Sequence, residues 1–316
     1  MRVPEPSRFG EAESVQTGQN LTVLILTLDE EKHIERCLRS AFQVAQQIFV
    51  VDSFSTDKTV KIAESLGAQV WQHEFKNHAT QLAWALDNLP IDTEWVMRMD
   101  ADEVISLSLA EEIQYKLPIA EFEINGFMVP LYVRFQGALI RHGGYPQWQL
   151  RMWRRGKAEI EQRWMDEKIV VQGKVGQLRN EYIDDNLNNI AWWTNKHNGY
   201  STREAIDLLN KKYGFLPVTV DSSTLTRQAR YTRWLKENLY VHFPLGLRAF
   251  LFFAYRMIFR LGILDGKSGF VFHFLQGFWY RFLVDVKVWE VERRMSAEGI
   301  DCVDAIRREF GVSPLP

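Results

Sequence analysis

Between residues 21 and 118 the chain alternates short apolar runs with amphipathic segments, and this alternation restricts the fold more than any other feature. The apolar runs are typical of buried strands, and they are LTVLILTL, QIFVVD, AQVWQH and TEWVMRMD (21–28, 47–52, 68–73 and 93–100). Helical spacing of apolar residues marks the segments between them, which are 30–45, 55–67 and 78–89. Strands separated by helices pair in parallel through right-handed crossovers. The sequence therefore predicts an α/β fold with a mostly parallel sheet and helices on both faces.

An acid-bearing loop follows three of these strands. The loops are TLDEE, DSFSTD and DADE (27–31, 52–57 and 100–103). Because ligands of such sheets bind beyond the carboxyl ends of the strands, we expect the three loops to form one site. Asp100 and Asp102 are two residues apart in an extended chain and therefore point the same way. The alternative is that Asp100, Asp102 and Glu103 cap the helix predicted over 105–117.

The composition of this acid-rich edge predicts the kind of ligand. Carboxylates with no His or Cys close in sequence suit a hard cation, Mg²⁺ or Mn²⁺, which shares its coordination with substrate phosphates. The chain contains neither GxxxxGK[ST] nor a GxGxxG after the first strand. A metal ion would then supply most of the positive field for a diphosphate.

The overall composition excludes some classes of function. The chain has 316 residues, 46% hydrophobic, and its formal net charge of −2 argues against nucleic-acid binding through bulk positive charge. Its two cysteines, Cys37 and Cys302, lie far apart and suit neither a disulfide framework nor a metal knuckle. Residues 1–20 are polar and are predicted to form a flexible arm rather than a secretory signal.

The order TLDEE, VVDSFSTDKT, MDADE resembles the nucleotide-sugar glycosyltransferases of family 2, which have the GT-A fold. The segment RLGILDGKSGFVFHFLQGFWYRFLVDVKVWE (260–290) is similar to the tail of the bacterial branch that builds lipopolysaccharide cores and surface polysaccharides. The resemblance implies inverting, metal-dependent transfer of a sugar from a nucleotide-sugar donor, a UDP-sugar, to a lipid-linked or lipopolysaccharide-core saccharide acceptor. The processive members' Gln-x-x-Arg-Trp motif does not occur in the chain, so one sugar per encounter is expected.

The resemblance also implies roles for individual residues. Nucleotide binding would fall to Thr27, Leu28, Glu30, Asp52, Ser53, Gln81 and Asp100. Asp52 would contact the base, and Asp100 would face the ribose and phosphates. Asp102, with Asp100, would hold the Mg²⁺ or Mn²⁺ ion bound to the diphosphate.

The chain departs from the family pattern at two places. Leu26 and Leu28 replace the customary Pro and Tyr of the first loop, which puts aromatic stacking on the base in doubt. Leu82 and Ala83 stand where a basic residue and an Asn are often found, which puts phosphate contacts from that helix in doubt.

Inverting transfer needs a base for the acceptor hydroxyl, and the resemblance places it in RWMDEKIVV (163–171). Asp166 and Glu167 are adjacent and point in opposite directions in an extended loop, so only one can face the acceptor. Glu167 is favoured, and a solvated turn without function is the alternative.

Further residues are predicted to contact the acceptor or the transferred sugar. The stretch RHGGYPQWQLRMWRR (141–155) combines glycines, which allow close backbone approach, with aromatic faces for sugar rings. Lys196 and Tyr200 lie one turn apart on a predicted helix and could contact the diphosphate or pair within the fold. The full set is Glu103, His142, Tyr145, Trp148, Arg151, Lys196 and Tyr200.

The aromatic C-terminal third predicts membrane contact. Residues 244–264 carry Arg248, Arg256 and Arg260 near one helical face and apolar side chains on the other, and residues 270–290 repeat this pattern. Such helices suit insertion into the headgroup layer without spanning the bilayer. The alternative is that they pack against the catalytic domain.

The sequence thus predicts a flexible arm (1–20), a GT-A catalytic domain (21–185) and a helical region (186–316) whose residues 241–290 meet the membrane. The catalytic domain divides into a nucleotide-binding half (21–118) and a β-rich acceptor-side half (119–185). The expected location is the cytoplasmic face of the bacterial inner membrane. The rival hypotheses are a sugar-phosphate nucleotidyltransferase and a membrane-bound scaffold with a degenerate site.

Overall fold

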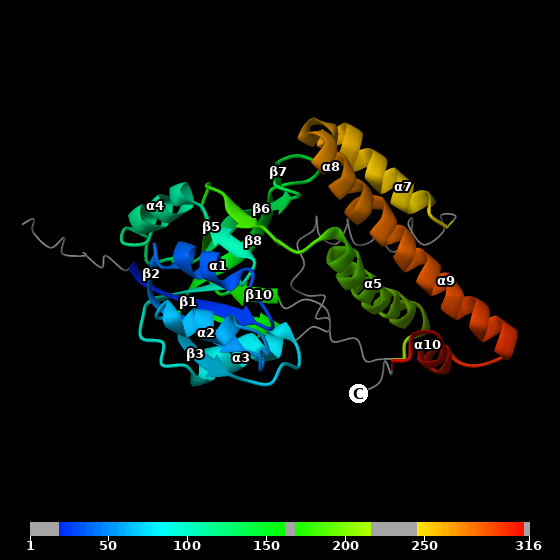
Figure 1. Ribbon diagram of the computed structural model, residues 1–316, viewed down its shortest axis with the longest axis horizontal. Coiled ribbons are helices and arrows are strands. Elements are labelled where there is room, and N and C mark those ends of the chain that lie inside the picture. The colour runs from blue at the N-terminus through cyan, green and yellow to red at the C-terminus, as the bar shows by residue number, and fades with distance from the viewer. Residues whose placement is uncertain (1–18, 162–167, 216–244, 313–316) are drawn as a thin grey trace, which may run out of the picture.

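The computed structural model describes residues 19–161, 168–215 and 245–312 (Figure 1). Its strands are β1 (Gln19–Thr27), β2 (Ala45–Asp52), β3 (Gln69–Gln72), β4 (Trp95–Asp100), β5 (Glu103–Ile105), β6 (Ile124–Phe135), β7 (Ala138–Ile140), β8 (Gln147–Arg154), β9 (Ala158–Glu161), β10 (Lys168–Val171), β11 (Lys174–Gln177) and β12 (Tyr182–Asp184). Its helices are α1 (Ile34–Ala41), α2 (Thr59–Ser65), α3 (His78–Asn88), α4 (Leu107–Lys116), α5 (Ile190–Tyr213), α7 (Leu247–Ala254), α8 (Gly266–His273), α9 (Tyr280–Glu298) and α10 (Cys302–Phe310). Short helical segments η3 (Tyr255–Phe259), η4 (Gly262–Asp265) and η5 (Phe274–Trp279) join the C-terminal helices.

The main sheet has the strand order β3-β2-β1-β4-β8-β6-β12-β5. Strands β1 to β4 pair in parallel, as the strand–helix alternation predicts, and the register sets Thr27 beside Asp52 and Leu26 beside Asp100. The carboxyl ends of β1, β2 and β4, with their acidic loops, therefore lie at one edge. Antiparallel β8 separates β4 from β6, so the second half of the sheet is mixed.

Helices cover both faces of the sheet, as predicted. Side chains of β1 alternate between two cores, because successive residues of a strand point to opposite faces. Val23 and Ile25 pack with α1, α2 and α4, whereas Leu24 and Leu26 pack with α3 and the β9–β10 hairpin. Helix α1 buries Ile34, Cys37, Leu38 and Ala41, at the spacing of one helical face.

Two local differences from the sequence-based prediction have a common cause, which is side-chain bonding in the first two acidic loops. Helix α1 begins at Ile34 rather than residue 30, and α2 begins at Thr59 rather than 55. The residues left out of these helices bond to each other across the two loops, as described below. The helix-cap alternative for the third loop is wrong: Ser106 accepts the hydrogen bond from Leu109 N–H at the start of α4, and Glu103 begins the short strand β5 instead.

The C-terminal helices form a second body of the fold, to the right of the sheet in Figure 1. Helices α5, α9 and α10 share a core that includes Ile206, Leu209, Val291 and Ile306. A smaller cluster joins this body to the sheet, and it contains Phe135 of β6, Tyr145 and Phe272 of α8. Within the described ranges no helix has the length and apolar character needed to cross a bilayer.

The arginines predicted to form a basic headgroup face do not all face solvent. Arg248 forms an ion pair with buried Asp285, and Arg256 is buried and donates from Nε to Gly143 O at 2.7 Å. Only Arg260 is exposed to solvent. The prediction of a common basic face for these three residues is therefore wrong, because two of the charges serve contacts inside the protein.

Candidate active site

A cavity of about 1320 Å³ lies at the carboxyl edge of β1 and β4 and extends to α5 and the C-terminal helices. Six of the residues predicted for nucleotide or metal line it, and they are Thr27, Leu28, Glu30, Ser53, Asp100 and Asp102. Four of those predicted for the acceptor or sugar line it as well, and they are Trp148, Arg151, Lys196 and Tyr200. The fold thus brings together side chains that are up to 173 residues apart in the chain, since Thr27 and Tyr200 both face this space.

The first two acidic loops are held together by hydrogen bonds. Asp29 N–H donates to Ser55 Oγ at 2.8 Å, and Asp29 Oδ1 accepts from Thr56 N–H at 2.8 Å. Glu30 N–H donates to Thr59 Oγ1 at 2.7 Å. Asp29 takes a positive φ of 54°, a conformation that Asp adopts more readily than most residues. These bonds fix the backbone that presents Leu28 and Glu30 to the cavity.

Asp52 and Gln81 lie beneath the cavity wall rather than in it. Asp52 is fully buried, and its carboxylate accepts hydrogen bonds from Thr27 Oγ1 at 3.0 Å and from the amide of Ser55 at 2.9 Å. Gln81 is also buried and donates from Nε2 to Ser53 Oγ at 3.1 Å. Asp52 therefore ties two loops together, and its contact with a base stays a prediction.

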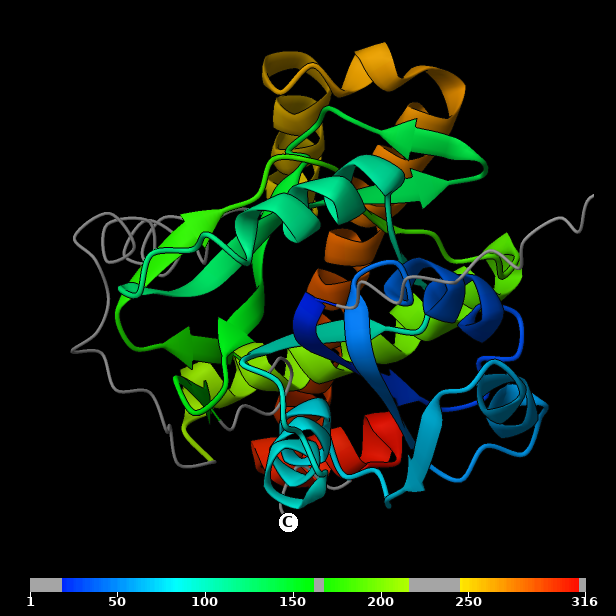
Figure 2. The same ribbon diagram turned by 90° about the vertical axis from the view of Figure 1, so that its left-hand side faces the viewer.

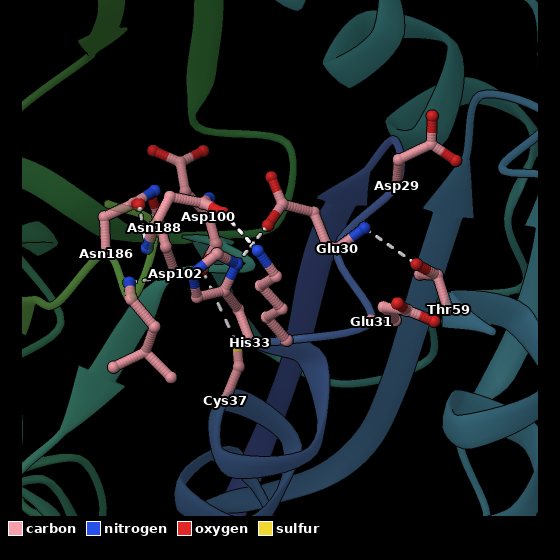
Figure 3. A network of polar contacts seen from close by, with 12 residues as sticks. Asp29, Glu30, Glu31, His33, Cys37, Thr59, Asp100, Asp102, Asn186 and Asn188 are labelled. Carbon is pink, nitrogen blue, oxygen red and sulfur yellow. Dashed lines mark hydrogen bonds and ion pairs between the residues drawn. The ribbon is translucent and has the colours of Figure 1, made fainter. Parts of the chain in front are cut away.

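His33 was not singled out from the sequence, yet it orients Glu30. The ring is buried, and Leu187 N–H donates to its Nε2 at 2.9 Å, so the ring hydrogen sits on Nδ1. That Nδ1 lies 2.5 Å from Glu30 Oε2. Figure 3 shows Glu30, His33, Asp100 and Asp102 side by side, with Asn186 and Asn188 next to them. His33 thus connects the first loop to the segment that precedes α5.

Asp100 is held by two arginines. Arg98 donates to its Oδ1 at 2.8 Å and Arg151 to its Oδ2 at 3.3 Å. Burial alone would raise the pKa of Asp100, but Arg98 and Arg151 outweigh it and hold that pKa well below its usual range. Asp100 is therefore a fixed anion whose two oxygens are already engaged. Arg98, two residues earlier on β4, shares a face with Asp100, a signal that sequence reasoning missed.

Glu103 lies below this pair and is buried. Its carboxylate accepts from the amide of Asp100 at 2.7 Å, from Tyr182 Oη at 2.6 Å and from Arg151. Burial raises the pKa of Glu103 to about 7, with Arg151 acting in the opposite direction and the charge of Asp100 adding to the rise. Glu103 therefore supports Asp100 and Arg151 from behind and is not part of the cavity lining.

The raised pKa of Glu103 makes a prediction for stability. Folded protein keeps a proton on Glu103 between about pH 4.5 and 7, where the unfolded chain has lost it. Unfolding then releases a proton, so the free energy of unfolding falls as pH rises through this range, by at most about 1.4 kcal/mol per pH unit. Urea denaturation across the range should show a shallower fall for Glu103→Gln than for the unsubstituted protein. Glu111→Gln, an exposed change on α4, is the matched control and should keep the original slope.

Asp102 and Asp184 face the cavity from neighbouring segments. Asp102 Oδ2 accepts from Asn186 Nδ2 at 2.9 Å, and its backbone oxygen accepts from Asp185 N–H at 3.0 Å. Burial raises the pKa of Asp184 well above its usual value, and the charges of Asp102, Glu103 and Asp100 add to the rise. Asp184 and Asn186 follow a strand just as the predicted acids do, so the same rule applied to YIDDN would have found them.

These carboxylates fit a divalent cation. Asp102 and Asp184 supply hard oxygen donors, and crowded carboxylates are the setting in which a cation relieves the repulsion. No set of three or more His, Cys, Asp or Glu side chains poised to hold a metal occurs in the part of the chain that the structure describes. A Mg²⁺ or Mn²⁺ ion held there would complete its coordination with water or with oxygens of a bound ligand.

A further part of the cavity lining is aromatic. Trp192, Trp193, His197 and Tyr200 of α5 line it together with Trp148 of β8. The His197 ring stacks on Trp193 at 3.5 Å between centroids, and burial lowers the pKa of His197. Trp192 and Trp193 were not predicted from the sequence, although they precede Lys196 in the same helix. Their spacing does not distinguish aromatic side chains that face a ligand from those that pack in the core.

Lys196 is the cation that faces the carboxylates. Its Nζ lies 4.7 Å from the centre of the Trp192 ring and 5.9 Å from that of Tyr200. Burial lowers the pKa of Lys196, but Tyr200, Asp102, Glu30 and Asp184 outweigh it, so that the net pKa is raised. The ammonium group therefore stays charged in the cavity.

The remaining predicted residues lie elsewhere or outside the described ranges. His142 Nδ1 is 2.6 Å from Asp265 Oδ1, and Tyr145 Oη donates to Gln276 Oε1 at 3.3 Å, so both residues connect β7 and β8 to the C-terminal helices. Neither lines the cavity, although Gln276 does. Asp166 and Glu167 fall in 162–167, outside the described residues, and the assignment of the base stays a prediction.

A sheet whose parallel half gathers acids at its carboxyl edge, over a large cavity, defines an α/β protein with a candidate ligand-binding site at this edge. Residues 22–185 match the family model described as glycosyl transferase family 2, and the chain belongs to this family. The GT-A fold with a helical C-terminal region, predicted from the sequence, is confirmed.

The relatives that match this chain are glycosyltransferases, and each match covers only part of both chains. An uncharacterized glycosyltransferase of Rickettsia bellii is 39% identical over 97 residues, which cover 31% of this chain and 32% of that protein. The prophage-derived glycosyltransferase SunS of Bacillus subtilis is 27% identical over 129 residues, which cover 38% of this chain and 29% of SunS. The chain thus spans about a third of the length of the curated relatives it matches.

Among solved structures, glucosyl-3-phosphoglycerate synthase from Mycobacterium tuberculosis in complex with Mn²⁺, UDP and glucosyl-3-phosphoglycerate is 22% identical. The match covers 42% of this chain and 51% of the synthase chain, with a TM-score of 0.30. A likeness of this size does not establish a shared substrate.

Proposed function

We propose that the protein is an inverting, metal-dependent glycosyltransferase that moves one sugar from a nucleotide-sugar donor, a UDP-sugar, to a saccharide acceptor. The acceptor is lipid-linked or part of a lipopolysaccharide core, and the reaction takes place at the cytoplasmic face of the bacterial inner membrane. The observation that carries the proposal is that one cavity is lined both by the carboxylates of Asp102 and Asp184 and by aromatic side chains of α5 and β8. A charged leaving group and a sugar ring can be bound there at the same time.

The donor side of the cavity is built for a nucleoside diphosphate. Thr27, Leu28, Glu30 and Ser53 line the part next to the first two loops, where carboxylate and hydroxyl oxygens can accept from a base or ribose. Asp102 and Asp184 are the residues that would hold Mg²⁺ or Mn²⁺, which stabilises the charge developing on the departing diphosphate. Lys196 faces the same carboxylates and adds a fixed positive charge, which offsets the lack of a basic residue at Leu82.

The acceptor side supplies sugar-binding surfaces. Trp148 is 43% exposed, and the aromatic side chains of α5 face the same space, so a sugar ring can stack against them. In transfer with inversion the acceptor oxygen bonds to the anomeric carbon while the bond from that carbon to the diphosphate breaks. The proton of the acceptor hydroxyl passes to a carboxylate base, for which Glu167 or Asp166 stays the prediction.

Two alternative functions, a nucleotidyltransferase and a degenerate scaffold, differ from the proposal in the ligands bound and the products released. A nucleotidyltransferase joins a nucleoside triphosphate to a sugar phosphate and releases pyrophosphate, whereas a glycosyltransferase releases the nucleoside diphosphate. A scaffold with a degenerate site would bind neither a nucleoside triphosphate nor a nucleoside diphosphate more tightly when a metal ion is present. The hydrogen bonds of Asp29, Asp52 and His33, which fix the loops around the cavity, favour a working site over a degenerate one.

Calorimetric titration of UDP with and without Mn²⁺ tests the proposal. We expect UDP to bind at least about tenfold more tightly with Mn²⁺, because the ion links the diphosphate to the carboxylates. The same affinity with Mn²⁺ and with a chelator would reject the metal-linked site. A screen of nucleotide sugars for release of the free nucleotide then identifies the donor, and release of pyrophosphate from a triphosphate would instead favour the nucleotidyltransferase.

A further inference from the structure

The C-terminal helices expose an unusually apolar turn. We define the apolar tip as residues 255–270, which comprise η3, η4 and the first turn of α8. Ile258, Phe259, Leu261, Ile263 and Leu264 expose between 51% and 76% of their surface. A turn at the edge of a protein is normally polar, and a contiguous apolar surface of this kind marks a binding site for another apolar phase.

The exposed charges of the apolar tip are positive. Arg260 and Lys267 are exposed, whereas Asp265 is the one acid between residues 245 and 275 and its side chain is only 3% exposed. Asp265 accepts hydrogen bonds from the amides of Arg141 and His142 and pairs with the His142 ring. The outer surface of the tip therefore combines apolar side chains with positive charge that forms no ion pair among the residues that the structure describes.

The apolar tip is bonded directly to the wall of the candidate active site. Gly143 N–H donates to Arg260 O at 2.7 Å, and Arg256 Nε donates to Gly143 O at 2.7 Å. A Cβ on Gly143, whose φ is 67°, would lie 2.2 Å from the His273 ring, so only glycine permits this close approach. The loop that contains Gly143 leads into β8, which carries Trp148 and Arg151, and Phe272 and Gln276 beyond the tip line the cavity.

We propose that the apolar tip inserts into a lipid leaflet rich in anionic headgroups and, through its bonds to Gly143, sets the aromatic acceptor wall at the membrane surface. Figures 1 and 2 both place α7 and α8 at the upper end of the molecule, where a flat surface can reach them. Apolar side chains enter the acyl boundary while Arg260 and Lys267 meet the headgroup phosphates. A second copy of the chain fits less well, because two-fold pairing would set Arg260 and Lys267 against the same cations.

This inference deepens the proposed function, since it assigns the surface at which a lipid-borne acceptor would be met, and it can be tested separately. The full-length protein is floated with vesicles of phosphatidylcholine alone and of an equal mixture with phosphatidylglycerol. We expect flotation with the mixed vesicles, and a partition at least about tenfold lower for Phe259→Ser/Ile263→Ser/Leu264→Ser, because three exposed apolar side chains are lost. The matched control, Leu107→Ser/Phe122→Ser, removes equally exposed apolar side chains from the catalytic half and should float unchanged.

The charges are tested by Arg260→Glu/Lys267→Glu. We expect its partition into mixed vesicles to fall at least about tenfold, toward the value measured with neutral vesicles, and the preference of the unsubstituted protein for mixed vesicles to weaken at high salt. Equal flotation of the tip variants and the unsubstituted protein would overturn the proposal. So would a dimer, seen by light scattering without lipid, that the serine variants dissociate while no form floats.

Titration of UDP with the same variants separates this inference from the proposed function. Variants that no longer float but still bind UDP with Mn²⁺ place the effect at the tip. Flotation of a protein that binds no nucleotide would leave the tip assigned and reject the glycosyltransferase site.

Discussion

Asp102→Asn is expected to lower sugar transfer at least about a hundredfold and to remove the effect of Mn²⁺ on UDP affinity. The substitution keeps the size of the side chain and its bond partner Asn186, which donates to Asp102 Oδ2 at 2.9 Å. It removes one of the two carboxylates that can hold a divalent cation beside the diphosphate. The readouts are the rate of nucleotide release and the calorimetric titration of UDP.

Asp87→Asn is the control for this substitution, because Asp87 is an exposed acid on α3 outside the cavity. It should leave both readouts unchanged. A transfer rate for Asp102→Asn within about twofold of the control would exclude a metal role for Asp102. Circular dichroism and urea denaturation should show the same fold for both variants, since neither side chain is part of the core.

Arg151→Leu is expected to destabilise the protein by about 3–5 kcal/mol, because it leaves the buried carboxylate of Glu103 without its cation, whereas Asp100 keeps its bond to Arg98. Arg151 is 5% exposed and contacts both Asp100 and Glu103. Urea denaturation at pH 7.5 measures the loss. At pH 5.5 the loss should be smaller, because Glu103, whose pKa is about 7, accepts a proton there and no longer needs a counter-charge.

The matched control is Arg39→Leu, which breaks an exposed Arg39–Glu35 pair on α1 and should cost no more than about 0.5 kcal/mol. Adding Glu103→Gln to Arg151→Leu should recover part of the stability, because it removes the charge that Arg151→Leu leaves without a partner. A loss for Arg151→Leu as small as that of the control, or one that does not change with pH, would show that the buried ion pair does not stabilise the fold.

The parts of the site that could be predicted lie next to the ends of strands. Thr27, Glu30, Asp100 and Asp102 each follow a strand of strong apolar character, and the rule for parallel sheets places strand ends together. Arg98 and Asp184 obey the same geometry but were not singled out, because an arginine within a strand and a short strand such as β12 give weak local signals. His33 could not be found this way, since its role depends on Leu187, 154 residues later.

In the C-terminal region, too, contacts between residues distant in sequence could not be predicted. Helical periodicity predicts helices over 244–290, and α7, α8 and α9 lie there. The direction of each side chain was not predictable, because Arg248 and Arg256 meet Asp285 and Gly143, which belong to other elements. Arg256 is buried and the Arg248 side chain is 23% exposed, whereas apolar side chains of the tip are exposed.

The sequence by itself determined the order of strands and helices, the meeting of the acidic loops at one edge and the family, because each depends on local apolar periodicity and on residues next to strand ends. Only the tertiary structure decided which carboxylates face the cavity. Asp52 and Glu103 are buried beneath it, because other elements of the fold enclose them and bond to their carboxylates, whereas Asp102 and Asp184 line it.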